Sequence, residues 1–198
     1  MIASRRFTSL AALAAACLFV ATFAALHRGW YDNEEIVDLP VYETYGNAIE
    51  RGSIPYRDFR LEYPPAALPM FMLPALLSDK GDRPAFRRAF EGTMALCGAL
   101  AILCAGLILA ALGATRTRVV ATLAAIAVFP LLLGSVVLTR FDLWPIALVL
   151  AALAALSAAV LIGFELVLTH WFYLYIPWFF PFVAFALLYR RDPSAQVH

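Results

Sequence analysis

Long apolar stretches separated by polar residues constrain the fold of this chain more than any other feature. Residues 7–26 form the first, and 94–114, 119–139 and about 143–163 are of similar length. A helix of about twenty apolar residues crosses the roughly 30 Å hydrocarbon core of a bilayer. A last, aromatic-rich stretch covers residues 171–189. The sequence therefore predicts an all-α polytopic transmembrane protein with about five to six spans.

Composition supports a membrane protein and excludes other classes. Of 198 residues, 63% are hydrophobic and 15% are charged, whereas soluble domains carry about a quarter charged residues. The net charge is +1 and no basic stripe with interleaved aromatic residues occurs, which argues against nucleic-acid binding. Cys17, Cys97 and Cys104 lie in apolar stretches and form no CxxC pair, so we expect packing roles for them.

One long polar interval interrupts the apolar sequence, and we expect it to carry the function. We expect a single membrane domain made of a first span (1–26), an outer loop (27–93), the remaining spans (94–189) and a tail (190–198). The first span is interpreted as an uncleaved anchor rather than a signal peptide, because more spans follow. The basic residues Arg5 and Arg6 place the N-terminus in the cytoplasm. The loop is then extracytoplasmic, on a multi-pass plasma-membrane protein.

Two short helices are expected in this loop. Asp38 is placed to cap a helix that has Leu39 and Pro40 in its first turn and ends at Gly52. Residues 66–77 are apolar, but a helix of this length rises only about 18 Å. We therefore expect it to be re-entrant or interfacial, which gives five crossings. The distribution of arginines favours six crossings instead.

Three sequence blocks in the loop resemble a known family. They are DLPVYxxYG (38–46), PYRDF (55–59) and EYPP (62–65), in that order. Together they resemble the first outer loop of the GT-C-fold membrane glycosyltransferases. They are most similar to glycosyltransferase family 87, the polyprenyl-phosphate-mannose-dependent mannosyltransferases. The RFDL motif at Arg140 and the aromatic final span also resemble that family.

The resemblance implies an enzyme that transfers a hexose, mannose, from a polyprenyl-phosphate donor to a lipid or glycan acceptor. It implies no cofactor and no metal site, with a divalent cation left open, and no partners beyond these substrates and membrane lipids. The sequence has no nucleotide-binding glycine loop, which fits a lipid-linked donor. Family members are roughly twice as long, so the resemblance implies that the middle spans are absent, with a join at 161–168.

Two functions from other classes stay open. A shortened, non-catalytic relative could keep the loop as a surface that binds lipid or a partner protein. A transporter is less favoured, because no span carries paired charges of the kind that transport relays use.

Asp38 and three arginines are the candidates for the central chemistry. Sugar transfer needs a base for the acceptor hydroxyl and a cation for the leaving phosphate. The resemblance aligns Asp38 with the loop aspartate of the family, which implies that Asp38 is the catalytic base. A plain helix cap is the alternative role. Arg57, Arg60 and Arg140 are candidate phosphate ligands because of their guanidinium geometry.

Asp58 and Glu62 lie four residues apart and are candidates for orienting the acceptor or a divalent cation. The alternative is a solvated turn in which Asp58 or Glu62 forms a salt bridge with Arg57 or Arg60.

Three further side chains complete the candidate substrate-binding set. Asp142 opens a span, where charge is costly, and its alternative role is pairing with Arg140. Tyr42 and Tyr56 could stack on a sugar, although aromatic residues at a membrane surface need no such reason.

Overall fold

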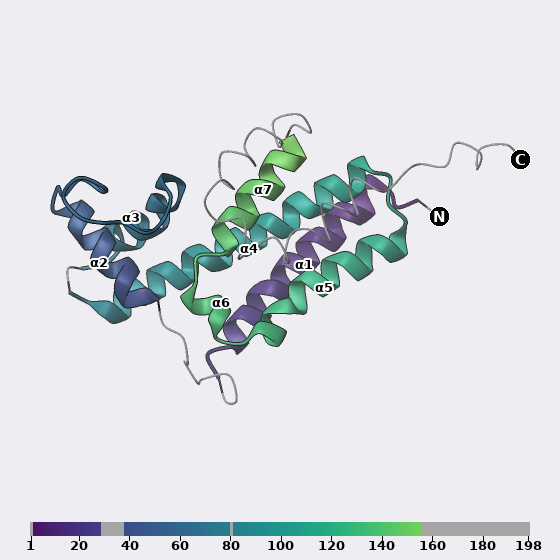
Figure 1. Ribbon diagram of the computed structural model, residues 1–198. Coiled ribbons are helices and arrows are strands. Elements are labelled where there is room, and N and C mark those ends of the chain that lie inside the picture. Colours follow the sequence, from purple (N-terminus) through teal and green to yellow (C-terminus); the bar gives the residue numbers. More distant parts are fainter. Residues whose placement is uncertain (1, 29–37, 80, 156–198) are drawn as a thin grey trace, which may run out of the picture. The chain divides into compact units, whose positions relative to one another are not determined.

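The computed structural model describes residues 2–28, 38–79 and 81–155 (Figure 1). These ranges are helical apart from turns and connecting segments, and contain two isolated bridges but no β-strand. The described part of the chain is thus all-α, as predicted. It lies within one compact unit, Met1–Val160. The predicted final span, the tail and the expected join lie outside the described residues.

Among the described residues, three helices are long and apolar enough to cross a membrane: α1 (Arg5–Ala25), α4 (Arg83–Ala111) and α5 (Arg116–Leu133). Each starts at a residue whose side-chain oxygen accepts a backbone amide of the first turn, which is how N-caps stabilise helices. These caps are Ser4, Asp82 and Thr115. Their length and composition indicate a membrane protein.

The helix α1 runs antiparallel to α4 (Figure 1). At one end, the Ala3 amide donates to the Ala114 carbonyl at 3.0 Å. At the other, His27 Nε2 lies 3.6 Å from Glu91 Oε2. The start of α1 and the α4–α5 turn therefore share one end of the bundle. The end of α1 and the start of α4 share the opposite end, which we call the loop end.

Small residues let α1 approach α4 closely. A Cβ at Gly98 would lie 2.2 Å from Cζ of Phe19, and one at Gly106 would lie 2.7 Å from Cβ of Ala12. Small residues have the same role at helix–helix contacts in membranes.

The helix α5 lies alongside α1. The Thr22 hydroxyl donates to the Ala127 carbonyl at 2.7 Å, close to Pro130. Such bonds from Thr satisfy backbone groups near proline in membrane helices.

Two predicted spans differ in extent from the helices that contain them. The helix α4 begins at Arg83, before the apolar stretch predicted from residue 94, because Asp82 caps it and Phe86 and Phe90 bury one face of its polar first turns. The helix α5 ends at Leu133 rather than at 139, because Gly134 adopts φ 68° and breaks it.

Four short helices complete the described fold. They are α2 (Leu39–Glu50), η2 (Pro65–Ala67), α3 (Leu68–Leu76) and α6 (Val136–Thr139). The helix α7 (Leu143–Ala155) covers the described part of the fourth predicted span. Gly52, with φ 87°, ends the α2 segment as predicted.

The loop end has its own aromatic core, which joins α2 and α3 to α4. We call Tyr42, Tyr63, Phe71, Phe90 and Phe141 the aromatic cluster. The Tyr42 ring stacks on Phe71, with centroids 4.9 Å apart. Each buried ring removes a large apolar area from water, so this cluster stabilises the end that carries the polar loop.

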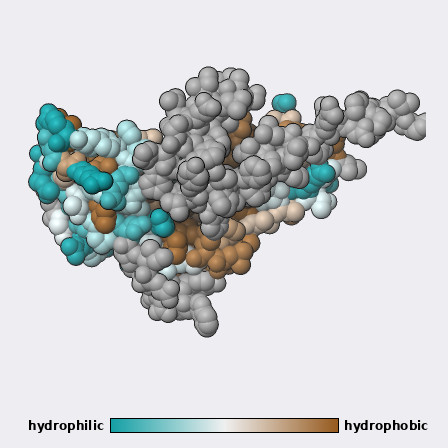
Figure 2. Space-filling view, viewed as in Figure 1, coloured by the Kyte–Doolittle hydropathy of each residue, from teal (hydrophilic) through white to brown (hydrophobic). Residues whose placement is uncertain are grey.

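Surface character follows the same division. Figure 2 shows hydrophilic residues gathered at the end that carries α2 and a hydrophobic patch on the visible surface beside it. The exposed large hydrophobic residues of α1, α4 and α5 include Leu10, Leu13, Val20, Leu100, Leu107, Val128 and Leu132. An apolar surface of this extent is expected where helices face lipid.

Candidate functional site

Asp38, Arg140 and Asp142 meet at the loop end, although Asp38 is far from the other two in sequence. Arg140 Nε lies 3.6 Å from Oδ2 of Asp38 and 3.8 Å from Oδ2 of Asp142. The three side chains are 29% to 39% exposed. We call this group the Asp38–Arg140 cluster. It places a carboxylate and a guanidinium together on partly exposed side chains.

Asp38 stands at the start of α2, as predicted, but its side chain forms no capping hydrogen bond. The prediction that the Asp38 carboxylate caps α2 is therefore wrong. Pro40 has no amide to offer, and the Val41 amide donates to the backbone carbonyl of Asp38 at 3.0 Å. The carboxylate instead accepts from the Tyr42 hydroxyl at 3.4 Å and faces Arg140.

Tyr42 is fully buried within the aromatic cluster. The other rings of this cluster pack around the Tyr42 ring and leave neither of its faces open to a sugar. The expected stacking role therefore does not fit its position. Burial, together with the nearby Tyr63 and Asp38, raises the pKa of its hydroxyl far above the usual value. Tyr42 therefore stays a neutral hydrogen-bond donor beneath Asp38.

A break in the helices delivers Arg140 to this site. The chain leaves α5 at Gly134, forms the one-turn helix α6 and becomes extended at Arg140, with φ −118° and ψ 147°. The next residue, Phe141, is buried in the aromatic cluster. At the start of α7, Trp144 Nε1 donates to the Ala66 carbonyl at 2.8 Å. Phe141 and Trp144 thus fix the segment that carries Arg140 and Asp142.

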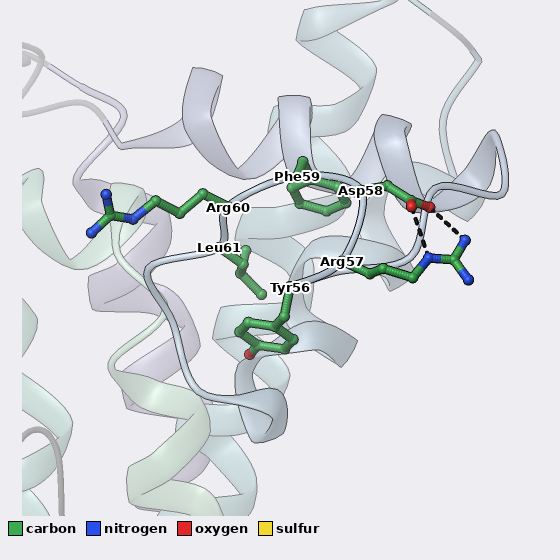
Figure 3. Close-up of a pocket in the computed structure, with 6 residues that line it drawn as sticks. All are labelled: Tyr56, Arg57, Asp58, Phe59, Arg60 and Leu61. Carbon is green, nitrogen blue, oxygen red and sulfur yellow. Dashed lines mark hydrogen bonds and ion pairs between the residues drawn. The ribbon is translucent and has the colours of Figure 1, made fainter.

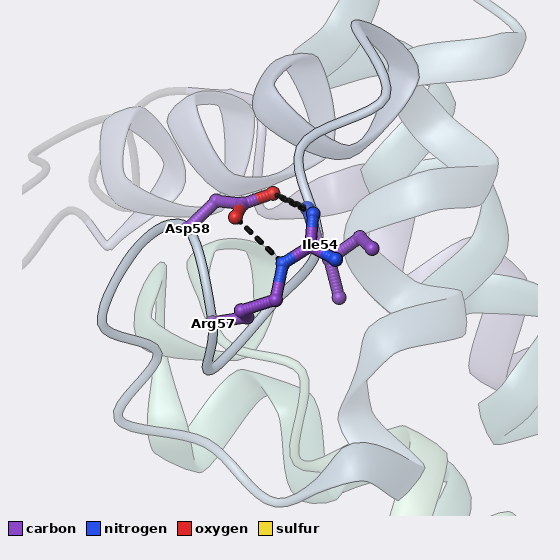
Figure 4. Close-up of polar contacts among 3 residues, drawn as sticks. All are labelled: Ile54, Arg57 and Asp58. Carbon is purple, nitrogen blue, oxygen red and sulfur yellow. Dashed lines mark hydrogen bonds and ion pairs between the residues drawn. The ribbon is translucent and has the colours of Figure 1, made fainter.

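The Asp58 carboxylate is engaged within its own turn (Figure 4). It accepts from the Ile54 amide at 2.8 Å and from Nε and Nη2 of Arg57 at 2.8 and 3.0 Å. Arg57, and to a smaller extent the Ile54 amide, hold the pKa of Asp58 below its usual value. This is the salt-bridged turn that the sequence offered as the alternative to acceptor binding.

The same loop forms an open pocket of about 380 Å³, lined by residues 56–61 (Figure 3). Arg60 extends from the loop away from Arg57 and Asp58, so the two arginines do not converge on one point in this pocket. Tyr56 is 51% exposed and has φ 66°, an unusual value for an aromatic residue. Its hydroxyl donates to the Tyr63 carbonyl at 2.5 Å, which holds this conformation.

Glu62 has an exposed side chain, and its main chain hydrogen-bonds the Tyr45 hydroxyl. Within residues 2–28, 38–79 and 81–155, no three His, Cys, Asp or Glu side chains are grouped so as to hold a metal ion. The geometry thus offers Asp58 and Glu62 no third ligand of these types among the described residues.

Sequence reasoning missed a second polar group at the loop end. Glu91 is only 8% exposed and accepts from Arg87 Nε at 2.7 Å, with His27 on its other oxygen. Nearby, Arg83 Nε lies 3.5 Å from Glu43 Oε2 and links α4 to α2. The Arg87–Glu91 spacing of four residues was a usable signal, because such pairs share one helix face.

No family model, curated protein or solved structure matches this chain. The resemblance to glycosyltransferase family 87 therefore stays a prediction. It depends on the three loop blocks and on RFDL.

Proposed function

We propose that this protein is a GT-C-type membrane glycosyltransferase. It transfers a hexose, which we propose is mannose, from a polyprenyl-phosphate donor to a lipid or glycan acceptor on the extracytoplasmic face of the plasma membrane. The observation that carries the proposal is the 3.6 Å approach of Arg140 to Asp38. These two residues come from DLPVYxxYG and RFDL, two of the segments that resemble the family.

The cluster suits the two requirements of the reaction. Asp38 accepts the proton of the acceptor hydroxyl as that oxygen attacks the anomeric carbon of the donor. The bond from this carbon to the phosphate oxygen breaks, and its electron pair leaves with the polyprenyl phosphate. Arg140 offsets the charge of the departing phosphate, for which its guanidinium is suited. Asp142 contacts the same guanidinium and holds it in place when no sugar donor is bound.

The arrangement of helix ends supports a five-crossing topology. The end of α1, the helices α2 and α3, and the start of α4 share the loop end, so nothing requires α3 to cross the membrane. With a cytoplasmic N-terminus, the α4–α5 turn is cytoplasmic, which suits Arg116 and Arg118. The Asp38–Arg140 cluster is then outside, where lipid-linked donors present their sugar.

Transfer by purified protein in liposomes tests the proposal. Polyprenyl-phosphate [³H]mannose is the donor and octyl mannoside is the acceptor probe. Asp38→Asn should lower the transfer rate by about 100-fold or more, because an amide is a far poorer base. Asp82→Asn is the matched control, since it also begins an Asp-x-Pro helix start and asparagine caps as well as aspartate.

Three outcomes discriminate between the open alternatives. If the wild-type chain and both variants transfer equally, the base must be sought at Asp58 or Glu62. If Asp82→Asn loses as much activity as Asp38→Asn, the loss reflects folding. If the folded wild-type chain transfers no sugar, the chain is a non-catalytic membrane protein and its loop binds lipid or a partner.

A further inference from the structure

The chain contains two Asp-x-Pro helix starts that use their aspartates differently. At α4, Asp82 has ψ 81° and its carboxylate caps the Ala85 amide at 2.9 Å. At α2, Asp38 has ψ −10° and its carboxylate caps nothing. Because the local sequences are so similar, local helix-start chemistry alone does not explain the difference. Contacts from elsewhere in the fold must hold the Asp38 carboxylate.

Two contacts fill that role. Arg140 approaches from the segment before α7, and the Tyr42 hydroxyl approaches from the next turn of α2. A helix without a side-chain cap is less stable, so these contacts must offset that loss. The Arg140 side chain is 32% exposed, whereas Tyr42 is fully buried.

The Tyr42 hydroxyl has little freedom to move. Its ring stacks on Phe71 and contacts Phe90, Tyr63 and Phe141. A ring packed on several sides cannot change rotamer without opening the core. The aromatic cluster thus works as a rigid support for a single donor aimed at Asp38.

We propose that Tyr42 is a positioning residue that holds the Asp38 carboxylate toward Arg140 and away from the amides of α2. The inference rests on the proposed function only for its consequence in catalysis. Tyr42 is inaccessible to substrate and acts through Asp38. Without its hydroxyl, the carboxylate turns toward the Val41 amide and caps α2, as Asp82 caps α4.

The first test compares Tyr42→Phe with Tyr45→Phe. Both changes remove one hydroxyl from α2 and keep the ring, but Tyr45 hydrogen-bonds the main chain of Glu62 rather than Asp38. Tyr42→Phe should lower kcat by about tenfold, the effect of losing one hydrogen bond to a charged group. KM for the donor should stay unchanged, and Tyr45→Phe should leave both constants unchanged. Equal effects of the two variants would overturn the proposal.

A second measurement does not depend on enzymatic activity. The infrared difference spectrum between wild type and Asp38→Asn isolates the carboxylate stretching band of Asp38. This band should shift in Tyr42→Phe and stay in place in Tyr45→Phe. Both variants must have the same thermal stability, so that a shift does not reflect unfolding. An unshifted band in folded Tyr42→Phe refutes the positioning role. If wild type transfers no sugar but the band shifts as expected, only the proposed function fails.

Discussion

A close approach of α3 to Gly46 on α2 yields a sharp test of the packing at the loop end. Gly46 on α2 faces α3, and a Cβ built there would lie 2.3 Å from the Phe71 carbonyl oxygen and 2.9 Å from Cβ of Ala75. Real Cβ atoms do not come this close to other heavy atoms. A carbonyl oxygen cannot move aside by a rotamer change. Gly46→Ala must therefore separate α2 from α3.

The magnitude follows from two opposing effects. Overpacking costs about 1–3 kcal/mol, and alanine regains up to about 1 kcal/mol of helix propensity over glycine. The expected net change for Gly46→Ala is a loss of about 1–2 kcal/mol of stability. Gly92 in α4 is the control, because a Cβ there meets nothing within 4 Å. Gly92→Ala should stabilise the protein by about 0.5–1 kcal/mol.

Gly98 supplies an intermediate case. Its added Cβ would meet the tip of the Phe19 ring at 2.2 Å, a side chain that can tilt if its neighbours yield. Thermal unfolding in one detergent should then rank the variants as Gly92→Ala above wild type, Gly98→Ala below it and Gly46→Ala lowest. An unchanged melting temperature for Gly46→Ala would refute the close packing of α2 on α3.

Three further predictions concern caps, pH and topology. Asp82→Ala should destabilise the protein by about 1 kcal/mol through loss of its cap, measured by thermal unfolding. The raised pKa of Tyr42 means that the unfolded state ionises first, so stability should be intact below about pH 10 and fall above it. Alkaline unfolding followed by phenolate absorbance checks this, and Tyr42→Phe should flatten the loss. In a background without native cysteines, Ser78→Cys should react with an impermeant thiol reagent in intact cells, and Arg118→Cys only after lysis. The reverse pattern, with Ser78→Cys protected and Arg118→Cys labelled before lysis, would exclude five crossings and restore six.

The apolar stretches and the start of α2 could be predicted from sequence, because burial in lipid and the Asp-x-Pro pattern leave strong local signals. The start of α4 could not be found by counting apolar residues. Its first turns are polar in composition, and only the spacing of Phe86, Phe90 and Met94 shows a buried face. The break after α5 was visible only as a single glycine, Gly134, within an apolar stretch.

The residues of the candidate site could be predicted from the sequence, but most of the contacts between them could not. Asp38 and Arg140 were candidates by type and by resemblance, but their proximity depends on how α5, α6 and α7 turn at the loop end. The burial of Tyr42 depends on the rings of Tyr63, Phe71, Phe90 and Phe141, which come from four separate segments, and no local pattern encodes this. Pairing of Asp58 with Arg57, by contrast, is local and was among the alternatives that the sequence offered.

The helix α4 is longer than a membrane crossing requires. Its 29 residues extend about 44 Å, well beyond the roughly 30 Å that hydrocarbon requires. The surplus, the polar turns from Arg83 to Thr93, holds α2 through Phe90 and Arg83. On the proposed topology these turns would stand in the headgroup layer, and α4 would keep Asp38 at the depth where lipid phosphates lie. The proposed function then implies a substrate whose chain stays in the bilayer rather than a soluble sugar phosphate.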